Sequence, residues 1–480
     1  MRTRALLGAF LPVFLAGQSA PSNPSTPPLA QLPAFATLME GARGRNPQLQ
    51  RSGHLLEASA ARVTAVGALP DPEVSFGFLR RAAMDVTVES PGMTPGNPPD
   101  LLMGVLPRGT EFSIMGSQVI PWPGKRRLRE EAARAGLGKV EAERDRVRLD
   151  LEGAVMEALL GWLRLRGEFR LLEEQDGLWA QAESIAKLCC EEGTGSQADL
   201  LQAMMERTRL KQRRLQLDNQ EATLLAGLRT LGALDDGQGL QVEGDLDALP
   251  RPGRPEEAAA VAEALARSPE WNAAHSEIAM AAGALGLGRM DLRPDIRLTA
   301  GLMREPGMGL GWKAEVGFAL PVFAGRKQQQ VVTQRLAEHR AAGSGRTALR
   351  LELTQRVQER LREWTLADRQ LRLYEDALLP QGELSIRSLM GTYEAGRTPF
   401  GSLLEALKAR LQDRQAHLDL LARLHSLSIA HYRVSLEPSG EGAPAAGMAS
   451  MARPNQARAS RGPSSAAPAP DAPASTPMKM

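Results

Sequence analysis

The sequence predicts a mainly α-helical fold with a small β part, built from long helical hairpins duplicated in tandem and four β-strands. The stretch from Lys125 to Gly193 contains no proline, and a helix of about 68 residues would be about 100 Å long. A second charged, Leu- and Ala-rich stretch runs from Pro321 to Gly396. Alternating apolar segments precede both stretches, which is the pattern of β-strands. No single globular domain needs a rod of that length.

Composition excludes several classes of function. Of the 480 residues, 24% are charged and the net charge is only +2, so nothing indicates nucleic acid or an acidic partner. The histidines have no metal-ligand spacing, and no Cys-x-x-Cys, P-loop or nucleophile-elbow motif occurs. We therefore expect no enzyme and no cofactor. The only cysteines, Cys189 and Cys190, are adjacent near a helix end, where packing thiols, an interchain disulfide and a metal site stay open.

The N-terminus has the pattern of a secretory signal peptide. Arg2 and Arg4 precede an apolar run, Ala5 to Ala16, that is too short to span a bilayer. A lipoprotein signal would carry cysteine at position 18, but the residue is Gln18, so no lipid anchor is expected. A mildly apolar start of a cytosolic protein is the alternative.

The elements of a first copy follow in order. Asn46-Pro47 separates two predicted helices, and alternating apolar residues then predict two strands joined by a Gly/Pro-rich loop. In chain order, the expected elements are helices at about 34–45 and 47–67, strands at 73–79 and 110–120, the long helix, and a return helix to about 234.

The sequence then repeats. Asn46-Pro47 returns as Ser268-Pro269, and Asp71-Pro72 as Arg293-Pro294, each 222 residues later. Gly193 returns as Gly396 at the far end of the second long stretch. Leu320-Pro321 is expected to open the second long helix, and Pro380 to kink or break it.

These patterns divide the chain into segments. The tail is Pro-, Ala- and Ser-rich and has too few large apolar residues to order itself. The expected segments are a signal peptide (1–20), a flexible segment (21–33), a first repeat (34–234, β-hairpin about 73–120, helical hairpin about 124–234), a linker (235–254), a second repeat (255–434, β-hairpin about 294–321, helical hairpin about 325–434) and a disordered tail (435–480).

Each predicted strand has one apolar face and one charged or small-polar face over roughly ten residues, which is typical of a tilted transmembrane β-strand. A hairpin covering a soluble core is the alternative. Four strands cannot close, and an open edge in lipid leaves backbone groups unpaired, so we expect a barrel shared among chains, about twelve strands for three chains. The residues expected to face lipid are Val74, Phe76, Ile296, Leu298, Val316 and Phe318; those expected to face the lumen are Arg297, Lys313 and Glu315.

The second long helix carries an apolar seam with steps of three, four or seven residues, as coiled coils do. The seam consists of Leu349, Leu353, Val357, Leu361, Trp364, Leu371, Tyr374 and Leu378. Charged residues between them, Arg360 included, are expected on solvated or lumen-facing surfaces. The helices alone would also fit a helical hairpin in a soluble complex.

Several segments resemble TolC-family outer-membrane factors in their order and spacing over about residues 35–434. They are Ile120-Pro-Trp-Pro-Gly-Lys125, Leu320-Pro-Val-Phe-Ala-Gly325, Tyr393-Glu-Ala-Gly396 and Leu403-Leu-Glu-Ala406. The resemblance implies a homotrimer with a twelve-stranded β-barrel in the outer membrane and a helical barrel across the periplasm. It also implies an exit duct for efflux, docked through its periplasmic tip to an adaptor protein that links it to an inner-membrane transporter, here expected to be of the RND type.

Within that resemblance, the two glycine turns would form the periplasmic tip. Glycine permits the positive φ that a helix reversal needs. We expect the exposed residues of this tip to contact the adaptor or the closed gate: Arg397, Thr398, Pro399 and Phe400, with Thr194 and Ser196. A plain turn without contacts is the alternative. The tip residues are Gly193, Thr194, Gly195, Ser196, Gly396, Arg397, Thr398, Pro399 and Phe400.

The substrate depends on weaker signals. The segments 68–73 and 117–126 look most like the heavy-metal efflux branch of the family, which favours metal cations over drugs, organic solutes or secreted proteins. The predicted hairpin loops hold Met84, Met93, Met103 and Met308, whose soft thioethers suit Cu(I), although such methionines can be incidental. An exported coiled-coil structural or adaptor protein is the remaining alternative.

Overall fold

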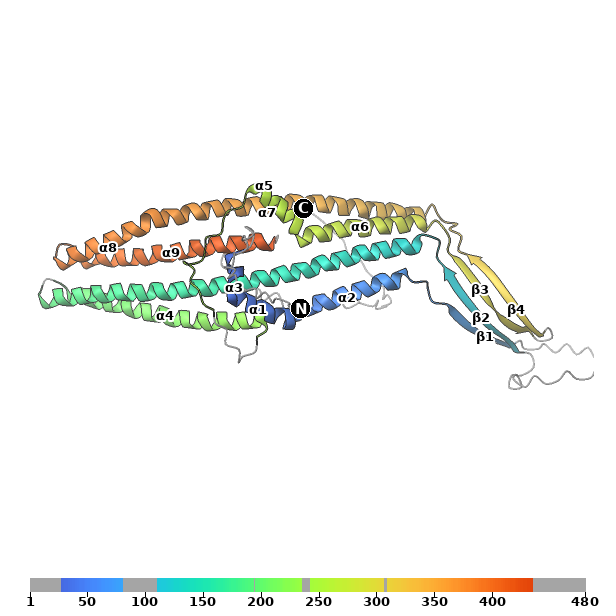
Figure 1. The fold of residues 1–480 in the computed structure, drawn as a ribbon, viewed down its shortest axis with the longest axis horizontal. Helices are drawn as coiled ribbons and strands as arrows, with labels where there is room; N and C mark the ends of the chain where they lie inside the picture. Colours follow the sequence, from blue (N-terminus) through green and yellow to red (C-terminus); the bar gives the residue numbers. More distant parts are fainter. Residues whose placement is uncertain (1–26, 81–109, 194, 235–241, 306–308, 435–480) are drawn as a thin grey trace, which may run out of the picture. The chain divides into compact units, whose positions relative to one another are not determined.

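The computed structural model describes residues 27–80, 110–193, 195–234, 242–305 and 309–434 (Figure 1). The expected signal peptide, the loop 82–109 with its three methionines, Met308 and the tail 435–480 lie outside the described residues. The described elements are, in chain order, η1 (Pro28–Gln31), α1 (Pro33–Arg45), α2 (Pro47–Gly67), β1 (Glu73–Arg80), β2 (Thr110–Ile120), α3 (Lys125–Glu191), α4 (Gln197–Gly232), α5 (Glu257–Arg267), α6 (Pro269–Met290), β3 (Ile296–Glu305), β4 (Gly309–Phe318), α7 (Gln328–Leu373), η2 (Tyr374–Leu378), α8 (Leu379–Glu394) and α9 (Phe400–Arg433).

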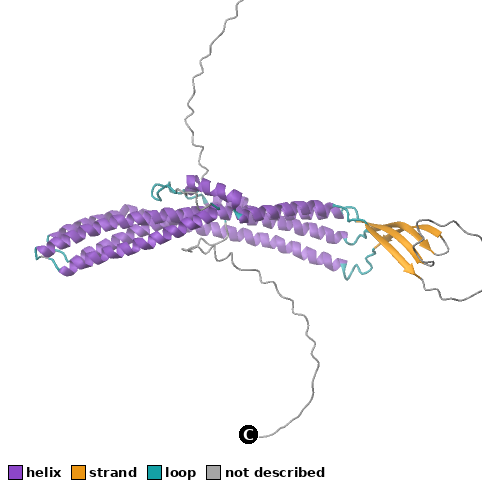
Figure 2. Cartoon of the chain, turned by 90° about the horizontal axis from the view of Figure 1, so that it is seen from below, coloured by secondary structure: helices purple, strands orange, loops and turns teal. Residues whose placement is uncertain are grey.

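Helix α3 confirms the predicted long helix, with 67 residues and no interruption. It packs against α2, α4, α6 and α9. The four strands form one antiparallel sheet in the order β1-β2-β3-β4. The helices that adjoin these strands, α2, α3, α6 and α7, lie side by side in the same order (Figures 1 and 2). The mainly helical fold with four strands is therefore as predicted.

Small residues let α3 and α6 approach closely. A Cβ added at Gly283 of α6 would lie 2.9 Å from Cβ of Ala132, and one at Gly138 of α3 would lie 3.0 Å from Oγ of Ser276. The distance at Gly283 is shorter than carbon atoms tolerate, so a larger residue there would push the helices apart, and one at Gly138 would force the Ser276 hydroxyl to move. This contact joins the first copy of the duplication to the second.

The largest core cluster gathers residues from α1, α3, α4, α7 and α9, among them Leu38, Leu159, Leu228, Trp364 and Leu427. Leu29 of η1 is fully buried in the same cluster. Residues 28–31 therefore differ from the flexible segment predicted for 21–33. The reason is that Leu29 and the residues that follow it cover the place where these helices meet.

Helix α7 begins at Gln328, not at Leu320-Pro321 as predicted. Short-range bonds hold the intervening residues in turns: the amide of Ala324 donates to Pro321 O at 3.1 Å and that of Lys327 to Phe323 O at 3.0 Å. The break predicted near Pro380 is confirmed as η2, a π-helical segment in which the amide of Leu379 donates to Tyr374 O. Proline has no amide proton, and a π-bulge relieves the missing bond by widening the preceding turn.

The apolar seam of α7 is confirmed, since Leu353, Val357, Leu361 and Trp364 are all buried. The prediction for Arg360 is wrong, because this residue is only 6% exposed. Helix α7 packs against two helices, α5 and α9, so residues outside the predicted apolar seam are covered as well. Burial, followed by the like charges of Arg356 and Arg433, lowers the pKa of Arg360 to about 10.

Among the described helices, none contains a stretch long and apolar enough to cross a lipid bilayer.

Candidate functional site

The pairing register sorts the sheet into two chemically distinct faces. In an antiparallel pair, directly opposed residues share a face. Phe76 is opposite Ile114, Leu298 opposite Val316, and Ile296 opposite Phe318. Following these pairs across the strands places all six residues predicted to face lipid on one face: Val74, Phe76, Ile296, Leu298, Val316 and Phe318.

The same register places Arg297, Lys313 and Glu315 on the opposite face. There Lys313 forms an ion pair with Glu315 at 3.1 Å. Large apolar side chains on the first face are open to solvent: Phe76 is 64% and Trp312 79% exposed. A soluble protein rarely leaves such a contiguous apolar surface uncovered, so the face must be covered by lipid or by protein.

An ion pair between a buried lysine and a half-buried aspartate fastens the sheet to the long helix. Lys125, the first residue of α3, is 4% exposed. Its Nζ donates to Arg293 O at 3.0 Å and to Oδ1 of Asp295 at 2.9 Å, and the amide of Trp122 donates to the same carboxylate at 2.9 Å. Burial by itself would raise the pKa of Asp295, but the Trp122 amide and Lys125 hold it below its usual value. The start of α3 is thereby tied to the strand of the second copy.

At the other end of the helices lie the two reversals. Gly193 has φ of 76° and Gly396 φ of 66°, so both adopt the left-handed conformation that the prediction required. The amide of Gly195 donates to Cys189 O at 2.8 Å, and that of Arg397 to Thr392 O at 2.9 Å. These bonds satisfy helix-terminal carbonyls, as left-handed caps do.

Most predicted tip residues lie at the surface of these turns. Thr194 is outside the described residues, and Gly195 and Thr398 are half-buried. Ser196, Arg397 and Pro399 are exposed as predicted, and the turn residues Gly193 and Gly396 are exposed as well.

The prediction that Phe400 is exposed is wrong, because only 2% of it is accessible. Phe400 is the first residue of α9, and its ring packs against Tyr393 with centroids 5.3 Å apart. Both belong to a core cluster beneath the tip that includes Trp179 and Leu403. An aromatic ring next to a tight turn is buried when the partner hairpin supplies a surface for it, which residue spacing does not reveal.

Sequence reasoning missed the residues that join the two hairpins. The hydroxyl of Tyr393 in α8 donates to Oδ2 of Asp199 in α4 at 3.3 Å. Burial and the neighbouring Asp199 carboxylate raise the pKa of Tyr393. Within the first hairpin, Arg207 of α4 pairs with Asp176 and Glu183 of α3, each at 2.9 Å. Tyr393 stands in a recognised tip motif, so its position was available, but its partner is 194 residues away.

The buried side of Cys189 faces this region, and both cysteines are free thiols. Of the three roles left open for the cysteines, the burial of Cys189 supports packing between helices. No group of three His, Cys, Asp or Glu side chains within the described residues could hold a metal ion.

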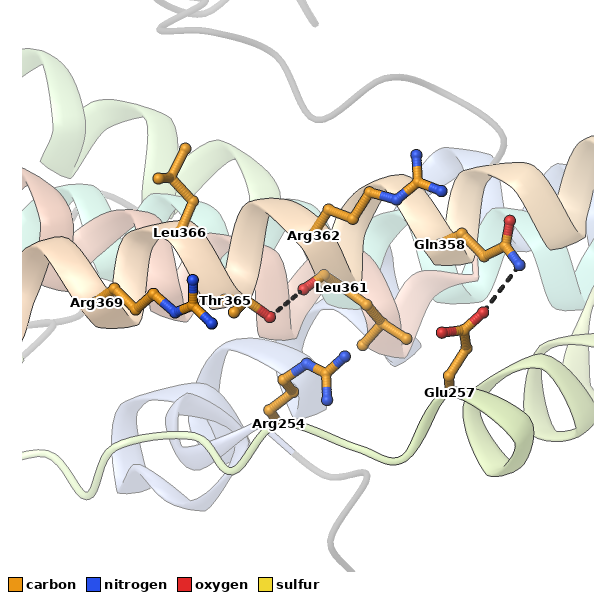
Figure 3. Close-up of a pocket in the computed structure, with 8 residues that line it drawn as sticks. All are labelled: Arg254, Glu257, Gln358, Leu361, Arg362, Thr365, Leu366 and Arg369. Carbon is orange, nitrogen blue, oxygen red and sulfur yellow. Dashed lines mark hydrogen bonds between the residues drawn. The ribbon is translucent and has the colours of Figure 1, made fainter.

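A groove of about 280 Å³ lies between the start of α5 and helix α7 (Figure 3). Arg254, Arg362 and Arg369 line it, and Nε2 of Gln358 donates to Glu257 at 2.8 Å across one end. The groove is open, and the Thr365 hydroxyl on its lining donates to Leu361 O at 2.8 Å. With three arginines and one carboxylate, it offers an electropositive surface.

Comparison with known proteins gives consistent matches. Residues 260–431 match the family described as outer membrane efflux protein. Cobalt-zinc-cadmium resistance protein CzcC of Cupriavidus metallidurans is 23% identical over 314 residues, covering 65% of this chain and 73% of CzcC.

The fold is similar to those of solved outer-membrane channels. The channel OprN aligns with a TM-score of 0.69 and 16% identity over 85% of this chain and 91% of OprN. CusC, whose structures were solved to follow folding and transmembrane channel formation, aligns with a TM-score of 0.68 and 16% identity. The alignment covers 83% of this chain and 92% of CusC. VceC of Vibrio cholerae aligns with a TM-score of 0.65 and 16% identity over 83% of this chain and 95% of VceC. At these identities the likeness shows the fold.

Proposed function

We propose, from the match of residues 260–431 to the outer membrane efflux protein family, that the chain forms a homotrimeric exit duct that releases heavy-metal cations from a tripartite efflux system. Its location is the outer membrane, with the long helices in the periplasm. Channels of this family act together with an adaptor and a transporter. The oligomer, the lipid-facing surface, the tip contacts and the cargo are parts of the proposal.

The observation that carries the proposal is the two-faced sheet with its open edges. β1 and β4 are the outer strands of the described sheet, and each has one edge without a strand beside it. In a bilayer such an edge would leave every second backbone group unpaired at several kcal/mol each, whereas closure among copies pairs them all. Three copies of four strands give about twelve strands, enough for an open lumen. The face with Phe76 and Phe318 then meets lipid, and the face with Arg297, Lys313 and Glu315 lines the channel.

The helical part supports a duct that reaches toward the inner membrane. Helix α3, with 67 residues, is about 100 Å long at 1.5 Å per residue. The Gly193 and Gly396 turns are at the far end from the sheet, where an adaptor would dock (Figure 1). We infer that this adaptor connects the duct to a transporter of the RND type. No catalytic activity and no resident cofactor are needed for this role.

Docking is tested with a photo-crosslinking residue at Arg397, an exposed position of the tip. We expect an adduct with the adaptor in cells. The same residue at Arg62, which is exposed on α2 at the sheet end of the helices, is the control and should give none. An adduct that is absent at Arg397, or equal at both positions, rejects the tip assignment.

Heavy-metal cargo is supported by the name of CzcC as a cobalt-zinc-cadmium resistance protein. The test is deletion of the gene followed by challenge with copper, silver, zinc, cobalt and cadmium salts beside a panel of drugs. We expect increased sensitivity to one or more metals and its reversal by the intact gene. Sensitivity to drugs alone would reject the metal cargo while leaving the duct in place.

A further inference from the structure

The chain already contains one seam between the two copies of its duplication. Along this seam β2 of the first copy pairs with β3 of the second, with Gln118 opposite Leu298. Just below the strands, Lys125 reaches across the seam to Asp295 at 2.9 Å. An intrachain register and an intrachain ion pair thus define how one copy sits beside the next.

The parts that make this seam occur again at the two open edges of the sheet. Ile120-Pro121 corresponds to Leu320-Pro321, 200 residues later. With one residue inserted in the turn of the second copy, Gly124-Lys125 corresponds to Gly325-Arg326. Asp71-Pro-Glu73 corresponds to Arg293-Pro-Asp295. Arg326, beyond β4, is therefore the counterpart of Lys125, and Glu73, at the start of β1, is the counterpart of Asp295.

The counterparts differ in burial although they agree in charge. Lys125 is 4% exposed, whereas Arg326 and Glu73 are both exposed. Within the described residues neither Arg326 nor Glu73 has an ion-pair partner, and the order β1-β2-β3-β4 keeps them at opposite edges of the sheet. One chain cannot bring these two charges together, but a second copy placed beside it can.

We propose that Arg326 pairs with Glu73 of the partner subunit, and that β4 pairs antiparallel with β1 of the partner subunit with Phe318 opposite Phe76. This register follows from transferring the Gln118–Leu298 pair to the corresponding residues of the two edges. It rests on the proposed homotrimeric duct, in which each copy has the next one at its open edge.

The derived register is consistent with the chemistry of the sheet. A shift of one residue would turn the apolar set of one strand to the other face. With Phe318 opposite Phe76, the apolar face continues from one copy to the next without a break. If corresponding residues of the two copies were separated by an odd number of positions, the same transfer would have set Phe318 opposite Ser75 or Gly77.

Exposed apolar residues mark the same edge. Leu320, Val322 and Phe323 are 71%, 80% and 74% exposed in the turn after β4. In the first copy the corresponding Pro121 is buried and Trp122 half-buried, because the second copy covers them. A neighbouring subunit at the β4 edge would cover the exposed turn in the same manner.

The register is tested by paired cysteines in a Cys189→Ser/Cys190→Ser background. Phe318→Cys with Phe76→Cys should oxidise to a covalent trimer, because each chain carries one half of each seam and opposed Cβ atoms are close enough to bridge. Phe318→Cys with Ser75→Cys, whose side chains lie on opposite faces, is the control and should stay uncrosslinked. A native trimer that yields no covalent product, or yields it equally with the control, overturns the register. A protein that is monomeric in every mild detergent overturns the trimer itself, which is a different failure.

The ion pair is tested by charge reversal, which leaves the sheet residues intact. Arg326→Glu and Glu73→Lys should each lower the temperature at which the trimer dissociates, and the double variant should recover most of that shift. Arg387→Glu, an exposed arginine on α8, should leave the dissociation temperature unchanged. Single variants that behave like the Arg387 control, or a double variant as weak as the sum of the singles, would overturn the pair.

Discussion

The hydroxyl of Tyr393 donates a hydrogen bond to Asp199, 3.3 Å away. The two residues are 194 positions apart in the chain, and their bond joins the two helical hairpins. Tyr393 also packs on Phe400, so one side chain connects the turn of α8 and α9 with the start of α4. Together with the buried cluster beneath the tip, this contact holds the two reversals against each other.

Replacing Tyr393 by Phe keeps the ring contact with Phe400 and removes the hydrogen bond. The expected loss is about 1 kcal/mol, with Asp199 left free to take water. Hydrogen exchange followed by mass spectrometry should show faster exchange in peptides covering 190–200 and 392–400. Tyr432→Phe, which removes a 2.8 Å bond to Glu152 far from the tip, should leave those peptides unchanged. Equal exchange at the tip in both variants would mean that the bond does not restrain it.

Phe318→Arg tests which face of the sheet meets lipid. A charge on the lipid face costs about 2–4 kcal/mol near the bilayer midplane, because it loses its hydration there. We expect impaired barrel assembly, measured as the loss of the heat-modifiable band when the protein is folded into phospholipid vesicles. Lys313→Leu, on the other face, should assemble. Normal assembly of Phe318→Arg together with failure of Lys313→Leu would reverse the two faces.

Gly153 of α3 allows Arg433 to cross the helix surface. A Cβ at Gly153 would lie 2.6 Å from Cγ of Arg433, whose guanidinium pairs with Asp150 at 3.0 Å and Glu157 at 3.4 Å. Gly153→Ala should therefore destabilise the protein by about 1–3 kcal/mol despite the better helix propensity of alanine.

Gly177 of the same helix provides the matched control, since a Cβ there meets nothing within 4 Å. Gly177→Ala should stabilise by up to about 1 kcal/mol, because glycine is the poorer helix former. The two variants are compared by their midpoints of thermal unfolding followed by circular dichroism. Shifts of the same sign and size would show that the Arg433 crossing does not constrain position 153.

His425 of α9 predicts a dependence of stability on pH. It is fully buried, and neither ring nitrogen has a hydrogen-bond partner within the described residues. Burial lowers the pKa of His425 to about 4. An unfolded histidine has a pKa of about 6.5, so the unfolded chain takes up a proton that the folded chain refuses. This contribution, about 3 kcal/mol, is present above pH 6.5 and is lost as the pH falls toward 4.

The midpoint of thermal unfolding, measured between pH 7 and 4, should fall steeply for the native protein and less steeply for His425→Leu. His54→Leu, at an exposed position, should keep the native slope. The carboxylates whose pKa values are lowered, such as Asp176 and Asp295, lose their contribution below about pH 5 in both proteins, so the difference between the two slopes reports His425. An unchanged slope in His425→Leu would assign the pH response to other groups.

Local patterns determined the elements and the faces of the strands. Alternation with a period of two places Val316 and Phe318 on one side and Lys313 and Glu315 on the other, wherever the sheet lies. The duplication, recognised by the spacing of Asn46-Pro47 and Ser268-Pro269, also gave two equivalent hairpins, and the glycine turns followed from the need for positive φ at Gly193 and Gly396.

Packing between distant segments decided the rest. Phe400, Arg360 and Leu29 each sit in a stretch whose local pattern predicts exposure or flexibility, and each is buried because another helix, far away in sequence, covers it. The ties between Tyr393 and Asp199 and between Lys125 and Asp295 also depend on contacts across the two copies. The start of α7 at Gln328 depends on the backbone bonds of the turns before it. Periodicity reports which side of an element is apolar, but the free energy of burying a given side chain depends on the surface that arrives against it, and only the tertiary structure specifies that surface.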